Sequence, residues 1–209
     1  MGIPVLILGA SGSGKSTSLR TFGSDEVGII NVSGKPLPFK NDMKPYKSDD
    51  YAAITKVLKK ATAKSIVIDD AQYLMANEFM RTAKQTGYQK FTDLALNFWT
   101  LLQTVINDLA DDVIVYFLSH VETDQNGNSK MKTIGKMLDE KITLEGLFTI
   151  VLRTQVADGK YTFRTQTDGM DTAKSPMEMF DSLEIENDLK AVDDAIRNYY
   201  EIKVEKIEK

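Results

Sequence analysis

A glycine-rich segment, Gly9–Ser16 (GASGSGKS), constrains this chain more than any other feature. It fits the pattern G-x-x-x-x-G-K-[ST] of a phosphate-binding P-loop. The apolar run before it, Ile3–Leu8 (IPVLIL), is typical of a buried parallel strand. The segment after it, Ser16–Phe22, predicts a short helix that Gly23 ends. A chance match to a glycine-rich turn is the alternative, but strand, loop and helix follow one another as the P-loop requires.

The chemistry of a P-loop gives roles to these residues. Glycines let backbone N–H groups turn towards an anion, and the start of the helix adds partial positive charge. Lys15 is placed to reach the β- and γ-phosphates of a nucleotide, and the Ser16 hydroxyl to bind Mg²⁺. The predicted nucleotide-binding residues are Gly9, Ala10, Ser11, Gly12, Ser13, Gly14, Lys15, Ser16 and Thr17.

A second predicted strand ends in two acids. Lys64–Asp70 (KSIVIDD) carries three consecutive β-branched residues followed by Asp69 and Asp70. Ligands of open α/β sheets bind at the carboxyl edge of the strands, so we expect these carboxylates beside the P-loop. We predict that Asp69 holds Mg²⁺, commonly through water. The alternative is that the acids are helix caps and that Asp70 only caps the helix that follows.

A third predicted strand, Val113–Leu118 (VIVYFL), ends in Ser119 and His120. This end is where a γ-phosphate-sensing residue lies in a P-loop ATPase. His120 is the single histidine of a sequence without cysteine, so we expect no metal site built on it. A sensor role and an ordinary polar strand end both remain open.

The charge distribution leaves nucleic-acid binding open. The net charge of −4 and the sequence pI of about 5.2 argue against a protein that binds nucleic acid over its whole surface. A concentrated basic stretch nevertheless follows the His120 strand. Its lysines are Lys130, Lys132, Lys136 and Lys141. A solvated face is the default interpretation of this stretch, and a flexible DNA-contacting loop is the other.

The last third of the chain predicts an edge hairpin and a final helix. Gly146–Arg153 is expected as a strand, and Lys160–Gln166 as its antiparallel return after an Asp-Gly turn. Arg153 and Arg164 lie on this hairpin, where they either reach a neighbouring subunit's nucleotide or balance the acidic surface. Asn187 is expected to cap a helix that runs to about Tyr200.

Composition bounds the class of protein. The 209 residues, 42% hydrophobic and 27% charged, suit one globular domain, expected over residues 1–200 with a charged tail over 201–209. No apolar run is long enough for a transmembrane helix, so we expect no membrane partner. A cleaved signal peptide would remove the P-loop, which favours a cytoplasmic protein.

Together with the segment Thr133–Glu140 (TIGKMLDE), these motifs give the chain a resemblance to a known family. From Gly2 to about Tyr200 it resembles the phage-encoded ATP-binding proteins of the short RecA-like family, minimal recombinase cores linked to single-strand annealing. The resemblance implies an α/β P-loop NTPase fold with a mostly parallel sheet flanked by helices. It also implies ATP with Mg²⁺, single-stranded DNA, a single-strand-binding protein and a homo-oligomer, in the cytoplasm of a bacterial host.

The resemblance carries Gly9, Gly14, Lys15 and Ser16 to the phosphates and Mg²⁺. It carries Asp69 to Mg²⁺, and Ser119 with His120 to the sensor position. One departure matters. RecA proteins have a catalytic glutamate at the end of the strand after the P-loop helix, whereas this chain has Asn31 and no acid there. Asp70 substitutes by position, so the catalytic candidates are Lys15, Asp70 and His120. We therefore expect ATP hydrolysis that is slow or stimulated by DNA.

Two other functions remain open. One is a small-molecule kinase or NTPase without a DNA role, which the acidic pI favours and the lack of clustered arginines disfavours. The other is a module that binds nucleotide and a protein partner without turnover.

Overall fold

The computed structural model describes residues 1–202, and the side chains of Asp139 and Glu140 are not described. Of the charged tail expected over 201–209, residues 203–209 therefore lie outside the described part of the chain. Within residues 1–202, none of the helices combines the length and the apolar character needed to cross a membrane.

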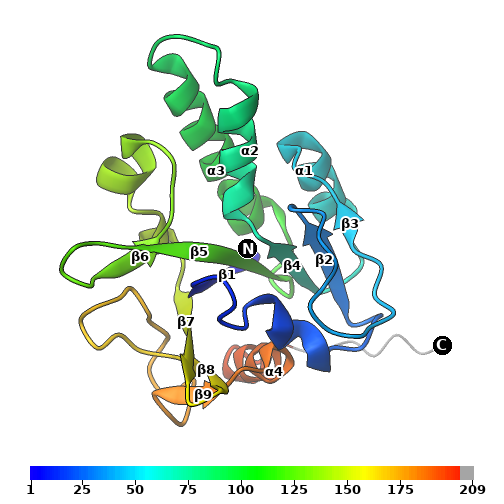
Figure 1. Ribbon diagram of the computed structural model, residues 1–209. Helices are drawn as coiled ribbons and strands as arrows, with labels where there is room; N and C mark the ends of the chain where they lie inside the picture. The colour runs from blue at the N-terminus through cyan, green and yellow to red at the C-terminus, as the bar shows by residue number, and fades with distance from the viewer. Residues whose placement is uncertain (203–209) are drawn as a thin grey trace.

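A mixed sheet of nine strands forms the centre of the fold (Figure 1). The strand order is β3-β2-β4-β5-β1-β7-β8-β9, and β6 pairs with β5 outside this path. The strands are β1 Ile3–Gly9, β2 Val27–Asn31, β3 Tyr46–Lys47, β4 Ser65–Asp69, β5 Ile114–Thr123, β6 Ser129–Met131, β7 Ile150–Ala157, β8 Lys160–Arg164 and β9 Glu184–Glu186. Neighbours from β3 to β7 are parallel, whereas β8 and β9 add antiparallel pairs at one edge. The predicted fold class is confirmed.

Helices cover both faces of this sheet (Figure 1). One face packs against α1 (Tyr51–Lys60), α2 (Gln72–Arg81) and α3 (Gln89–Asp108), and the other against η1 (Ser16–Thr21) and α4 (Leu189–Tyr199). Two short helical turns, η2 (Met137–Ile142) and η3 (Leu144–Leu147), lie between β6 and β7. Alternate side chains of β1 enter the two cores, which explains why its sequence is a continuous apolar run.

The register of the parallel strands places the predicted site residues at one edge. β5 lies between β1 and β4, so Gly9 at the end of β1 pairs with His120. On the other side of β4, Asn31 at the end of β2 pairs with Asp69. Segments that are far apart in the sequence therefore end side by side beneath the P-loop.

Two local predictions differ from the structure. The strand expected to begin at Gly146 begins at Ile150, because the apolar residues Leu144 and Phe148 are buried by a helical turn instead. Short apolar runs of this kind do not separate strand from helix by periodicity. The cap of α4 is Asp188 rather than Asn187, since the Asp188 carboxylate accepts the Ala191 N–H at 3.0 Å.

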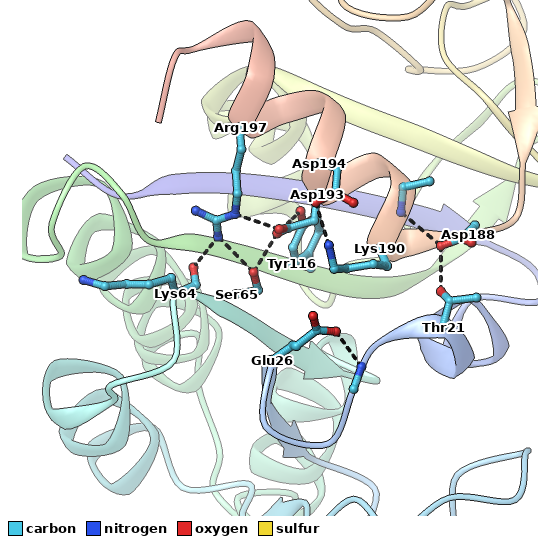
Figure 2. Close-up of polar contacts among 12 residues, drawn as sticks. Thr21, Glu26, Lys64, Ser65, Tyr116, Asp188, Lys190, Asp193, Asp194 and Arg197 are labelled. Atoms are coloured by element: carbon cyan, nitrogen blue, oxygen red, sulfur yellow. Dashed lines mark hydrogen bonds and ion pairs between the residues drawn. The ribbon is translucent and has the colours of Figure 1, made fainter. Parts of the chain in front are cut away.

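A buried ionic network attaches α4 to the amino ends of β4 and β5 (Figure 2). Asp193, only 3% exposed, accepts hydrogen bonds from Ser65 Oγ at 2.7 Å, Tyr116 Oη at 2.8 Å and Arg197 Nε at 2.7 Å. Arg197 also donates to two backbone carbonyl groups just before β4 and β5. Burial, reinforced by Asp193, raises the pKa of Tyr116 well above its usual value, so its hydroxyl stays a donor.

Replacing Asp193 should destabilise the fold strongly. Asp193→Ala leaves the Arg197 charge buried and unpaired, so we expect the free energy of unfolding to fall by about 3–5 kcal/mol. The matched control is Asp194→Ala, which removes the exposed pair with Lys190 (2.6 Å; Figure 2) and should cost about 0–1 kcal/mol. Urea unfolding measures both values. Equal losses of unfolding free energy in the two variants would contradict a stabilising role for the buried ionic network.

Candidate active site

The P-loop has the conformation that its glycines predict. The chain turns at the end of β1, and Gly12 (φ 75°) and Gly14 (φ 93°) lie in the left-handed region that favours glycine. The helix that follows is a short 3₁₀ segment, η1, rather than a regular α-helix. The partial positive charge at the start of such a short segment is weaker than at the start of a regular α-helix. An anion bound here would therefore be attracted mainly by the loop N–H groups and Lys15.

Lys15 is buried and folded back onto the loop. Its side chain, in a residue 6% exposed, donates to Gly9 O at 3.0 Å and to Ala10 O at 2.9 Å. Burial lowers the Lys15 pKa to about 8, and the nearby charges of Asp70 and Asp69 offset part of that effect. A phosphate would exchange these neutral carbonyl partners for an anionic one, which favours the charged form of Lys15.

A threonine of β7 braces the loop from the side. Thr154 Oγ1 lies 2.6 Å from Ser13 Oγ and donates to Leu8 O at 3.1 Å. A Cβ on Gly9 would lie 1.8 Å from Thr154 Oγ1, so only glycine fits there. The sequence contains no signal for this contact, because Thr154 belongs to no motif and reaches the loop only through the β1–β7 pairing.

The two predicted Mg²⁺ ligands are in contact. Ser16 Oγ donates to Asp69 Oδ1 at 2.7 Å, across the gap between η1 and the end of β4. Burial raises the Asp69 pKa to about 6, and the Ser16 hydrogen bond offsets part of that rise. Within residues 1–202, no group of three or more ligating side chains forms a self-contained metal site. Two protein oxygens fit Mg²⁺, which commonly completes its shell with phosphates and water.

Asp70 is directed towards His120. The ring nitrogen Nε2 of His120 lies 3.6 Å from Asp70 Oδ1. The backbone N–H of His120 donates to Gln72 Oε1 at 3.2 Å. Burial, with the Lys15 charge, lowers the pKa of His120, so at neutral pH the contact joins a neutral imidazole to a carboxylate. Asp70 has φ 60°, an uncommon conformation for a residue other than glycine, and the alternative that it caps α2 is wrong. The cap of α2 is Ala71, without a side-chain cap bond.

The end of β2, where RecA proteins have a catalytic glutamate, carries Asn31. Asn31 is buried and folds back on its own turn, where its Nδ2 donates to Lys35 O at 2.6 Å and its Oδ1 accepts the Gly34 N–H at 2.7 Å. Lys35 Nζ lies over the Tyr73 ring, 5.3 Å from its centroid, and the Tyr73 and His120 rings are nearly perpendicular with 6.1 Å between their centroids. Asn31 thus shapes the loop that follows β2 and provides no carboxylate at this position.

Thr17 lies in η1 directly after Ser16, partly buried, and Ser11 and Gly12 form the exposed tip of the loop. The predicted phosphate-binding residues therefore form one continuous segment, with Asp69 in contact with Ser16 and His120 paired with Gly9. Sequence reasoning missed Thr154, Gln72 and Tyr73, which carry no motif of their own.

A comparison with protein families matches residues 1–177 to the family described as AAA domain. The chain belongs to this AAA domain family. The match includes the P-loop, Asp69, Asp70 and His120, so the protein carries an AAA-type P-loop ATPase domain, a class associated with nucleotide binding and hydrolysis and usually with Mg²⁺. No curated protein matches the sequence.

The two shifted pKa values predict a pH window for Mg-ATP binding. Above pH 8, Lys15 (pKa about 8) loses its proton in the free protein, so affinity should fall by up to about tenfold per pH unit. Below pH 6, Asp69 (pKa about 6) gains a proton that Mg²⁺ must displace, so affinity should fall again. Titration calorimetry across this range measures both limbs.

The controls are single substitutions. Lys15→Ala should weaken Mg-ATP binding and remove the fall in affinity above pH 8. In Asp69→Asn, the affinity should fall at low pH only as far as the protonation of ATP itself requires. An alkaline limb that persists in Lys15→Ala would show that another group causes it.

Proposed function

We propose that this protein is a Mg-ATP-dependent ATPase of the phage RecA-like type, which binds single-stranded DNA and acts in recombination or single-strand annealing. The observation that carries the ATPase part is the meeting of Lys15, the Ser16–Asp69 pair and the Asp70–His120 pair at one edge of the sheet. The DNA part is supported by the resemblance to the short RecA-like family and by the basic stretch after His120.

Each residue has a separate task in this proposal. The P-loop N–H groups and Lys15 hold the phosphate chain, and Ser16 with Asp69 holds Mg²⁺, which neutralises charge on the phosphates. Asp70 orients water for in-line attack on the γ-phosphoryl group. The neutral His120 ring lies beside Asp70 and acts as the γ-phosphate sensor, changing its contacts when the γ-phosphoryl group is bound.

A direct backbone connection supports coupling between nucleotide and DNA. His120 lies within β5, which continues into the β5–β6 hairpin, and the Lys132 N–H donates to His120 O at 2.9 Å. A shift of His120 on γ-phosphate binding would therefore move β6, which carries Lys130, and Lys132 directly after it. Phosphate contacts by such lysines would supply affinity without sequence preference.

ATPase assays with and without single-stranded DNA test the proposal. We expect DNA to stimulate hydrolysis and ATP to tighten DNA binding, with Asp70→Asn retaining ATP affinity but losing turnover. Lys132→Ala should lower the slope of log affinity against log salt by about 1 in fluorescence anisotropy. DNA affinity that is the same with and without ATP would contradict the coupling.

A cavity of about 600 Å³ beside the P-loop tip favours a second candidate, a small-molecule kinase. It is lined by Ser11, Gly12 and Arg153, whose Nη1 is buried without a hydrogen-bond partner. An acceptor substrate with a phosphate would suit that guanidinium. Phosphoryl transfer to a panel of nucleosides and nucleotides, with Arg153→Ala as control, separates this candidate from a DNA-dependent ATPase.

A further inference from the structure

Asn187 has a buried side chain with neither of its polar atoms satisfied. The residue is 2% exposed, and both Oδ1 and Nδ2 are without a hydrogen-bond partner among the described residues. Buried amides are normally paired, so an exception of this kind calls for a ligand, a water or a functional reason. Asn187 is also not the helix cap that its sequence position suggests, because Asp188 takes that role.

The unsatisfied amide lies against the P-loop. Its Oδ1 is 3.1 Å from the point that a Cβ on Gly14 would occupy, and Tyr161 Cδ1 is 2.9 Å from the same point. The backbone around Asn187 is fixed to η1, because Arg20 donates to Asn187 O at 2.6 Å. Thr21 Oγ1 also donates to Asp188 at 2.6 Å, as Figure 2 shows. The backbone that carries the amide is therefore fixed beside the loop.

The strand order places Tyr161, and Asn187 beside it, on the side of the P-loop away from Asp69 and His120. The Ser16–Asp69 and Asp70–His120 pairs define the γ-phosphate end, on the side of β1 that faces β5 and β4. The other neighbour of β1 is β7, followed by β8, which carries Tyr161. A nucleotide with its γ-phosphate at Asp69 and its phosphate chain across the P-loop would bring its base to Tyr161 and Asn187.

We propose that Asn187 reads the base of the bound nucleotide, with adenine as the base, and that Tyr161 is the ring on which the base stacks. A carboxamide presents one acceptor and two donors, which match the N6 amino group and an adjacent ring nitrogen of adenine. Tyr161 is 45% exposed and lies beside the same point of Gly14, so its ring offers a stacking surface next to the amide. The proposal requires this ring to turn when the base binds, so that the amide becomes accessible. The inference rests on the proposed ATP site and adds its base specificity.

Comparison of nucleotides with the bare phosphate chain tests this role. In the presence of Mg²⁺, Asn187→Ala should weaken ATP binding roughly tenfold or more and leave the affinity for inorganic tripolyphosphate unchanged. Equal losses for both ligands would overturn the proposal, since Asn187 would then support only the P-loop. No loss for either ligand would overturn it as well.

A change on the ligand tests the same contact in the unaltered protein. Purine riboside triphosphate, which lacks the N6 amino group, should bind more weakly than ATP to the wild type, and about as well as ATP to Asn187→Ala. Tyr161→Phe should keep the ATP affinity and Tyr161→Ala should reduce it, again without change for tripolyphosphate. Wild-type protein that binds the two purine nucleotides equally would contradict the proposal. Failure to bind tripolyphosphate at all would instead contradict the P-loop function.

Discussion

The site depends on the interactions of the buried Lys15 ammonium group with the loop carbonyls and with the charges of Asp69 and Asp70. That group lies at the carboxyl edge of the sheet with loop carbonyls as its hydrogen-bond partners, and the charges of Asp69 and Asp70 partly compensate its burial. A cation held in this way has more to gain from a phosphate than one in water, because its charge is already desolvated. The glycines, Thr154 and the strand order all serve to keep that cation and the two acids at one place.

The position of β5 between β1 and β4 determines how the parts communicate. It brings His120 next to Gly9 and separates the P-loop strand from the strand that ends in Asp69. The same strand continues beyond the site into the hairpin with β6, where Lys132 bonds back to His120 O. One strand thus links the proposed γ-phosphate sensor to the basic stretch, whereas β7 and β8 lie on the other side of β1, where we propose the nucleoside binds.

Much of the site could be predicted because its residues belong to local patterns. The P-loop, the acids after Ser65–Ile68 and the polar end of the third strand each follow an apolar run, and parallel strands end at a common edge. The interpretation of single polar residues was less secure, since Asn and Asp suit many local roles. Asp70 was open to interpretation as a cap and is not one, and Asn187 was expected as a cap that Asp188 provides.

The sequence by itself determined the class of fold, the P-loop and the acids at the end of the strand Ser65–Asp69, because glycine spacing and strand-end acids act over short stretches of chain. The contact between Ser16 and Asp69, 53 residues apart, depends on the tertiary structure that places the end of β4 beside the P-loop. Only the tertiary structure decided which distant side chains complete the site. Thr154 braces Ser13, and the amide of Asn187 lies against Gly14, through contacts between segments more than a hundred residues apart in the chain. Such contacts arise from strand pairing and helix packing, which leave no periodicity or spacing in the sequence.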